Sequence, residues 1–158
     1  MNRPFTVLLV EDNPDDAMLI ARYLEDAGRA VASVSSLTEA RKHLMSAGAD
    51  VVLLDLGLPD SRGEDAVTGL SGVFPDVPIV VLTGLDDEDV GQRAVEAGAQ
   101  DYLVKGRVEP RLLDRSLRYA IERKRAERAI ARLAAIMSSL CDECGRRLTP
   151  PGGHASAS

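Results

Sequence analysis

The feature that most constrains the fold is a short run of apolar residues that stops at a single acid. Val51 to Leu54 favour β-structure, have no polar residue among them, and are followed directly by Asp55. Such a strand is typically buried on both faces, as in a parallel sheet covered by helices. Its carboxyl end then lies at the edge where open α/β folds bind their ligands. Asp55 is therefore a candidate for chemistry, although a strand can also end at an acid merely because it surfaces there.

Similar runs recur along the chain and alternate with segments of helical periodicity. Further strands are expected at residues 6–10, 30–34, 79–82 and 101–104. One of the intervening helices opens with the capping box Ser36–Glu39, and another begins at Pro14 after the capping residue Asn13. The connections are short, so right-handed crossovers are expected. We predict an α/β fold in which a five-stranded parallel sheet carries helices on both faces.

Composition and charge narrow the functional class. The 158 residues suit one domain plus an appendage, and no apolar run approaches the length of about 20 residues that a membrane span needs. With no secretory signal at the N-terminus, we expect a cytoplasmic protein without a membrane partner. Residues 1–105 hold eight basic and nineteen acidic side chains, a net charge of −11. This surplus disfavours a nucleic-acid partner and suits cation binding.

Four of the five predicted strands end in reactive side chains. The ends of parallel strands share one edge, so these groups are expected to gather in one pocket: Glu11, Asp12, Asp55, Thr83 and Lys105. Three neighbouring carboxylates repel one another unless a cation joins them, and Mg²⁺ prefers such oxygen ligands. The sequence therefore predicts an Mg²⁺ site at this edge.

A metal at this edge suggests phosphoryl chemistry. Asp55 could act as an oxygen nucleophile towards phosphorus and form an aspartyl phosphate. Thr83 would donate a hydrogen bond to a phosphoryl oxygen, and Lys105 would offset its charge. Gly57 leaves room for its backbone carbonyl to face the ion.

Four segments carrying these residues resemble the receiver domain of two-component response regulators. They occur in the family's order and spacing, over roughly residues 4–125: Leu8–Asn13, Leu54–Asp60, Val81–Gly84 and Asp101–Lys105. The resemblance is to a single-domain receiver with an extended C-terminal helix. It implies a flavodoxin-like, doubly wound sheet with strand order 2-1-3-4-5.

The resemblance also implies roles for the acidic residues and the glycine. Asp55 matches the phosphoacceptor, and Asp12 matches the direct Mg²⁺ ligand. Glu11 matches the acid that holds the metal's water molecules. Gly57 matches the position that supplies a main-chain carbonyl to the ion.

The remaining matched residues belong to the phosphoryl contacts and the switch. Thr83 and Lys105 match the two residues that contact the phosphoryl group. Tyr102 matches the aromatic residue whose ring turns inward when the threonine follows the phosphate. The family usually has a cis proline after the lysine, but this chain has Gly106. The peptide bond there is therefore expected either to be trans or to be strained.

The resemblance implies a regulator rather than an enzyme, with only self-catalysed phosphorylation and dephosphorylation. Its partners would be a sensor histidine kinase or histidine phosphotransfer protein and a downstream protein target. Two alternatives remain. A phosphatase of the haloacid-dehalogenase type also uses an aspartyl nucleophile, but it typically has a second acid two residues later, where this chain has Gly57. A pseudo-receiver would act by contact alone, without phosphorylation.

The sequence divides into a receiver at residues 1–125, a helical extension at 126–140 and a cysteine segment with a disordered tail at 141–158. The last helix is expected to begin at Pro110. Its first turns are expected to pack six residues on the sheet: Leu112, Leu113, Ser116, Leu117, Ala120 and Ile121. Its extension carries apolar residues at coiled-coil spacing: Ala126, Ile130, Leu133, Met137 and Leu140. This predicts a parallel homodimer or a connector to a partner helix, and a single fraying helix is the alternative. No DNA-binding output domain is expected in the chain.

Cys141 and Cys144 form a Cys-x-x-Cys pair, which we place after the end of the last helix. A helix C-terminus disfavours the thiolate that a redox pair needs. Structural zinc needs four ligands, for which His154 is a poor third, unless two chains supply four cysteines. We expect inert thiols.

Overall fold

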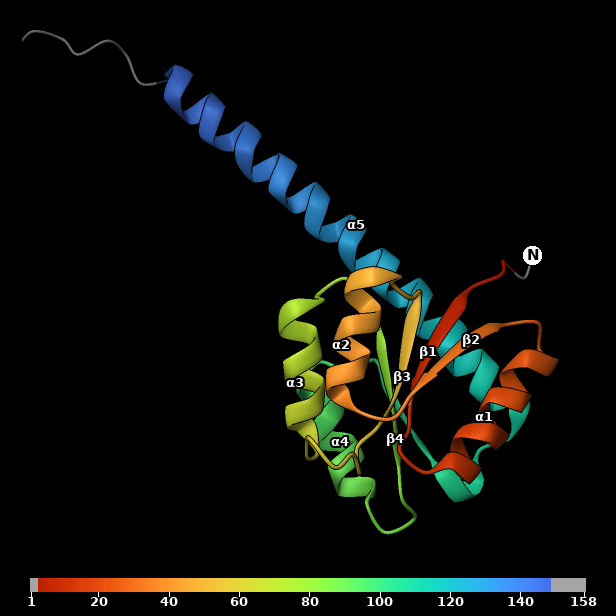
Figure 1. Cartoon of the computed structure of the whole chain (residues 1–158). Helices are drawn as coiled ribbons and strands as arrows, with labels where there is room; N and C mark the ends of the chain where they lie inside the picture. The colour runs from red at the N-terminus through yellow and green to blue at the C-terminus, as the bar shows by residue number, and fades with distance from the viewer. Residues whose placement is uncertain (1–2, 149–158) are drawn as a thin grey trace, which may run out of the picture. The chain divides into compact units, whose positions relative to one another are not determined.

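Five strands form an all-parallel sheet in the order β2-β1-β3-β4-β5 (Figure 1). The structure is a computed structural model that describes residues 3–148. The strands are β1 (Thr6–Val10), β2 (Ala30–Val34), β3 (Val51–Asp55), β4 (Ile79–Thr83) and β5 (Asp101–Val104). The helices are α1 (Pro14–Asp26), α2 (Leu37–Ser46), α3 (Glu64–Val73), α4 (Glu88–Glu96) and α5 (Pro110–Leu148), with the 3-10 turn η1 at Lys105–Arg107. The predicted fold class and strand order are confirmed.

The two faces of the sheet are covered by different helices because successive side chains of a strand point in opposite directions. Leu8 and Val52 face α2, α3 and α4, whereas Leu9 and Leu53 face α1 and the first turns of α5 (Figure 1). Every residue of β3 and β4 is buried. The absence of polar alternation in these strands is explained by this burial on both faces.

Local capping fixes where the helices begin. The Asn13 side chain accepts hydrogen bonds from the backbone N–H groups of Asp15 and Asp16, at 3.0 and 3.2 Å. Ser36 accepts one from Glu39 N at 3.1 Å, as the capping box predicts. The Glu39 carboxylate, however, binds Ser35 rather than closing the box on Ser36. Both helices therefore begin directly after a strand end, which places their first turns beside the carboxyl edge of the sheet.

A buried arginine joins the N-terminal segment, β2 and α5. Nε of Arg29 lies 2.7 Å from Oδ1 of Asp114, and Nη2 lies 3.2 Å from Oδ2. The guanidinium also lies 4.0 Å above the ring of Phe5. A paired and stacked guanidinium can be buried without leaving its charge uncompensated. The contact spans 85 residues of sequence and was not predicted.

The chain forms two units, residues 1–124 and 125–158. Within the second unit, the described part is helical to Leu148, so the prediction that Cys141 and Cys144 follow the end of the helix is wrong. The chain has no proline between Pro110 and Pro150, and the single Gly145 costs a helix only about 1 kcal/mol, which does not stop it. Both thiols are free and exposed. The predicted disordered tail at 149–158, with His154, lies outside the described residues.

The prediction that Leu112 packs on the sheet is wrong. Leu112 is 45% exposed, whereas Leu113 and Leu117 are fully buried. The buried stripe therefore follows 113, 117, 120 and 121, and residue 112 lies at its margin. Within residues 3–148, no helix is long and apolar enough to cross a membrane.

Leu117→Ala should lower the free energy of unfolding by about 2–5 kcal/mol, because it removes buried methyl groups and leaves a cavity. Leu112→Ala, five residues earlier on the same helix, should change it by no more than about 0.5 kcal/mol. Urea unfolding followed by circular dichroism measures both values. Equal losses in the two variants would contradict the assigned packing of α5.

Candidate functional site

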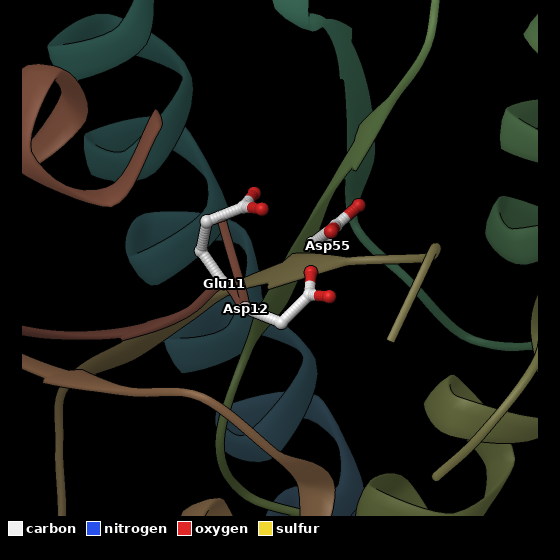
Figure 2. Close-up of side chains that lie close together, drawn as sticks. All are labelled: Glu11, Asp12 and Asp55. Carbon is white, nitrogen blue, oxygen red and sulfur yellow. The ribbon is translucent and has the colours of Figure 1, made fainter. Parts of the chain in front are cut away.

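Three carboxylates gather at the carboxyl edge of the sheet. Glu11 and Asp12 follow β1, and Asp55 ends β3, so neighbouring strands bring them together (Figure 2). One oxygen from each can be chosen so that all three lie within 4.8 Å of one another. Glu11 and Asp55 are only 3% and 6% exposed, whereas Asp12 is exposed. The cluster therefore combines two buried acids with one that is open to solvent.

Backbone hydrogen bonds hold the two buried acids in place. Glu11 N donates to Val34 O of β2 at 3.0 Å, and Glu11 Oε1 accepts from Asn13 N at 3.2 Å. Oδ1 of Asp55 accepts a hydrogen bond from Gly57 N at 3.0 Å. The turn after each strand thus orients the carboxylate at the end of that strand.

Lys105 neutralises part of this negative charge. Its Nζ lies 2.7 Å from Oε2 of Glu11, 3.3 Å from Oδ2 of Asp55 and 3.4 Å from Oδ2 of Asp16. Burial alone would lower the pKa of Lys105, but the neighbouring Glu11 and Asp55 outweigh this effect and raise it. The Lys105 ammonium is therefore charged at neutral pH and is positioned between two acids of the cluster. The described residues contain no cis peptide bond, so Lys105–Gly106 is trans.

Glu11 has a strongly perturbed pKa. Burial is the largest cause, and together with repulsion from Asp55 it outweighs the attraction of Lys105, raising the pKa of Glu11 from 4.5 to about 7. Its Oε2 is buried and lies 2.7 Å from the ammonium of Lys105, which occupies only one of the two lone pairs of this oxygen. This oxygen therefore has capacity for a further donor or for a cation.

The donor set fits a small, hard cation. Mg²⁺ binds oxygen at about 2.0–2.1 Å, so two of its ligands are at most about 4.2 Å apart. One oxygen of each carboxylate lies within 4.8 Å of the other two, so the three can surround one ion, some of them directly and others through its water molecules. A divalent ion would also neutralise the mutual repulsion of the three acids. We conclude that the residues present can accommodate Mg²⁺.

Six of the seven predicted site residues line one cavity of about 680 Å³: Glu11, Asp12, Asp55, Gly57, Thr83 and Lys105. Thr83 is buried, and its Oγ1 donates to the backbone carbonyl of Leu103 at 3.4 Å. Tyr102 is partly buried and is not among the residues that line the cavity. It lies on β5, where it pairs with Val81, two residues before Thr83.

Two further acids support the site and were not recognised from the sequence. Asp16 contacts Lys105 from the first turn of α1. Asp60 accepts hydrogen bonds from Leu37 N and Thr38 N, at 3.0 and 3.1 Å, which ties the turn after β3 to the start of α2. These backbone donors, with that of Leu37 first, lower the pKa of Asp60. The partners are 22 and 23 residues away, so no local pattern could have identified the contact.

The fold and the site together define an α/β protein with an acidic pocket at the edge of a parallel sheet. The family model described as the response regulator receiver domain matches residues 7–116. The chain therefore belongs to the response regulator receiver domain family of two-component systems. The resemblance stated from the four sequence segments is confirmed.

Individual relatives agree with this assignment. The chain is 34% identical to the swarming motility regulation protein RssB of Serratia marcescens, over 69% of this chain and 50% of the relative. It is 35% identical to the luminescence regulatory protein LuxO of Vibrio campbellii, over 61% of this chain and 21% of the relative. The chain thus spans half or less of the length of these two relatives.

A solved structure shows the same fold. The response regulator receiver domain protein from Clostridium thermocellum aligns with a TM-score of 0.70 and 29% identity. The alignment covers 77% of this chain and 97% of that one. Nearly the whole of that receiver domain therefore has a counterpart in this chain.

The raised pKa of Glu11 predicts a pH dependence of stability in metal-free protein. Glu11 ionises near 4.5 in the unfolded chain but near 7 in the folded one. Its contribution to the free energy of unfolding is therefore present below about pH 4.5 and is lost as the pH rises to about 7. Urea unfolding in EDTA, taken as the difference between wild type and Glu11→Gln, should show this decline. A difference that stays flat from pH 4 to pH 8 would show that the pKa is not raised.

Proposed function

We propose that this chain is a phosphorylation switch in which Asp55 accepts a phosphoryl group from a histidine kinase or a histidine phosphotransfer protein. One observation carries the proposal: Nζ of Lys105 lies within 3.3 Å of both Glu11 and Asp55, beside Asp12, in one cavity. A nucleophilic carboxylate, acids for a metal and a fixed cation are thus present together. We also propose that it acts in the cytoplasm and does not bind nucleic acid. The net charge of −11 on residues 1–105 supports the second of these points.

The proposed chemistry assigns a role to each side chain. Asp12 and Asp55 would bind Mg²⁺ directly, Glu11 would do so through water, and the Gly57 carbonyl would complete the protein ligands. The bound ion would offset the charge on the transferring group. An oxygen of Asp55, oriented by the N–H of Gly57, would form a bond to phosphorus while the bond to the donor's imidazole nitrogen breaks. Lys105, already 3.3 Å from Asp55, would then neutralise a phosphoryl oxygen.

The proposed signal is a movement of Thr83 and Tyr102. The hydroxyl of Thr83 has only a long hydrogen bond, 3.4 Å, to the carbonyl of Leu103. A phosphoryl group on Asp55 adds a charge of about −1.5 to −2 and stronger acceptors. Thr83 would exchange its present acceptor for the phosphoryl oxygen, and the ring of Tyr102 would follow. A downstream protein would recognise the changed face of α4, β5 and α5.

The chain is proposed to be a regulator and not an enzyme that turns over external phosphate esters. A phosphatase of the aspartyl-nucleophile class would place an acid two residues after the nucleophile, but this chain has Gly57. The pseudo-receiver alternative predicts no covalent product. Both alternatives give distinct outcomes in the experiment below.

Incubation with acetyl phosphate and Mg²⁺ should add one phosphoryl group, which intact-mass spectrometry detects. Asp55→Asn should abolish the adduct, and so should EDTA. Asp86→Asn is the matched control, since Asp86 is exposed and does not line the cavity, and it should be labelled like the wild type. No adduct and no phosphate release would instead support the pseudo-receiver, whereas multiple turnover without an adduct would support the phosphatase.

We further propose that the second unit forms a parallel homodimer. Within residues 125–148, large apolar side chains are exposed at coiled-coil spacing: Ile130, Leu133, Met137 and Leu140. If Ile130 and Met137 occupy the a positions, Leu133 and Leu140 occupy d. An isoleucine at a with leucine at d favours two parallel strands. A second copy of the chain would cover this stripe.

Leu133→Asp should convert the dimer to a monomer, because it introduces a charge at the centre of the stripe. Ser139→Asp, on the same helix and outside the stripe, should leave the dimer intact. Sedimentation equilibrium over a range of concentrations measures the mass of each variant. A monomeric wild-type chain would rule out the homodimer and favour a connector to another protein's helix.

A further inference from the structure

Gly91 in α4 lies where the two switch residues meet the helix. It is buried, and α4 packs on β4 and β5, the strands that carry Thr83 and Tyr102. A Cβ atom built on Gly91 would lie 2.7 Å from Cδ2 and 2.8 Å from Cγ of the Tyr102 ring. It would also lie 3.2 Å from the Cγ2 methyl of Thr83. Both switch residues therefore approach the same point of the α4 backbone.

The added Cβ at residue 91 would overlap with Cγ of Tyr102, and this atom limits how the overlap can be relieved. Cγ is the first atom of the Tyr102 ring, so rotation about χ2 leaves it in place. The overlap can be relieved only by a change of χ1, which moves the whole ring, or by separating α4 from the sheet. A deviation of χ1 large enough to clear the added Cβ moves the ring away from its staggered well and is therefore disfavoured. A Cβ at 91 would thus exclude the ring from its present position.

The two switch residues also share a face of the sheet. Tyr102 pairs with Val81, and Thr83 follows Val81 by two residues, so both side chains point towards α4. The Thr83 methyl group would meet the same added Cβ as the ring. The space beside Gly91 is therefore shared between them, and a movement of one changes the room available to the other.

We propose that Gly91 is a positioning residue for the switch: by lacking a side chain, it provides the site on α4 against which the Tyr102 ring rests beside Thr83. This inference rests on the proposed phosphorylation of Asp55 for its regulatory meaning. In the proposed switch, the Tyr102 ring can change between two rotamers only because residue 91 has no side chain. A side chain there removes one of the two states.

Gly91→Ala is the direct test, and Gly72→Ala is its matched control. Gly72 also lies in a helix, but a Cβ built there meets nothing within 4 Å. Alanine favours a helix over glycine, so the control should raise the unfolding midpoint or leave it unchanged. Gly91→Ala should lower the midpoint, and this loss should shrink in a Tyr102→Ala background, where the overlapping ring is absent.

The position of the ring can be followed by ¹⁹F NMR of the full chain labelled with 3-fluorotyrosine. The chain has three tyrosines, and Tyr102→Phe identifies the resonance of interest. In metal-free protein, that resonance should shift in Gly91→Ala and stay unchanged in Gly72→Ala. With Mg²⁺ and beryllofluoride, a phosphoryl mimic, its displacement should be at least halved in Gly91→Ala relative to wild type.

The outcomes separate this inference from the proposed function. An unmoved Tyr102 resonance in metal-free Gly91→Ala, together with the same stability loss in the Tyr102→Ala background, would overturn the role of Gly91. A beryllofluoride response equal to that of wild type would overturn its part in the switch. Failure of the proposed function appears elsewhere, as no phosphoryl adduct on the wild-type chain, and it leaves the metal-free comparison valid.

Discussion

The ion pair of Lys105 with Glu11 and Asp55 is the interaction on which the site depends. Two nearly buried carboxylates beside a third acid would be costly without a cation, because each loses hydration and repels the others. The ammonium reaches them from the loop after β5, so it joins three strand ends that the sequence keeps far apart. Its compensation is incomplete, because a single ammonium faces three carboxylates. The remaining negative charge is what makes the pocket receptive to a divalent ion.

The rest of the fold serves to hold these strand ends in place. The all-apolar strands β3 and β4 can pack on both faces only if helices cover the sheet, and this arrangement leaves the carboxyl edge as the place where polar groups collect. Asn13 and Asp60 then fix the loops beside the edge, one by capping α1 and the other by binding the first N–H groups of α2. The loops on both sides of the Asp55 carboxylate are therefore held in place by hydrogen bonds.

The two residues of the proposed switch, Thr83 and Tyr102, lie beside this edge on β4 and β5. Thr83 makes a single long hydrogen bond, and Tyr102 is only partly buried. Both rest against Gly91, where α4 offers backbone and no side chain. In the proposed switch, a change of charge at Asp55 would bias the positions of these two side chains.

The sequence by itself determined the strands, the order of elements, the helix caps and the identity of the acids at the sheet edge. The strands and caps follow from apolar runs and helical periodicity, which act over a few residues. The shared edge of the acids follows from the general topology of parallel strands. Only the tertiary structure decided the contacts of Arg29 with Asp114, Asp60 with α2, Asp16 with Lys105 and Gly91 with Tyr102. It also decided that Leu112 faces outward and that α5 continues through Cys144. Such features depend on how whole elements pack against one another, and the pattern of neighbouring residues does not encode that packing.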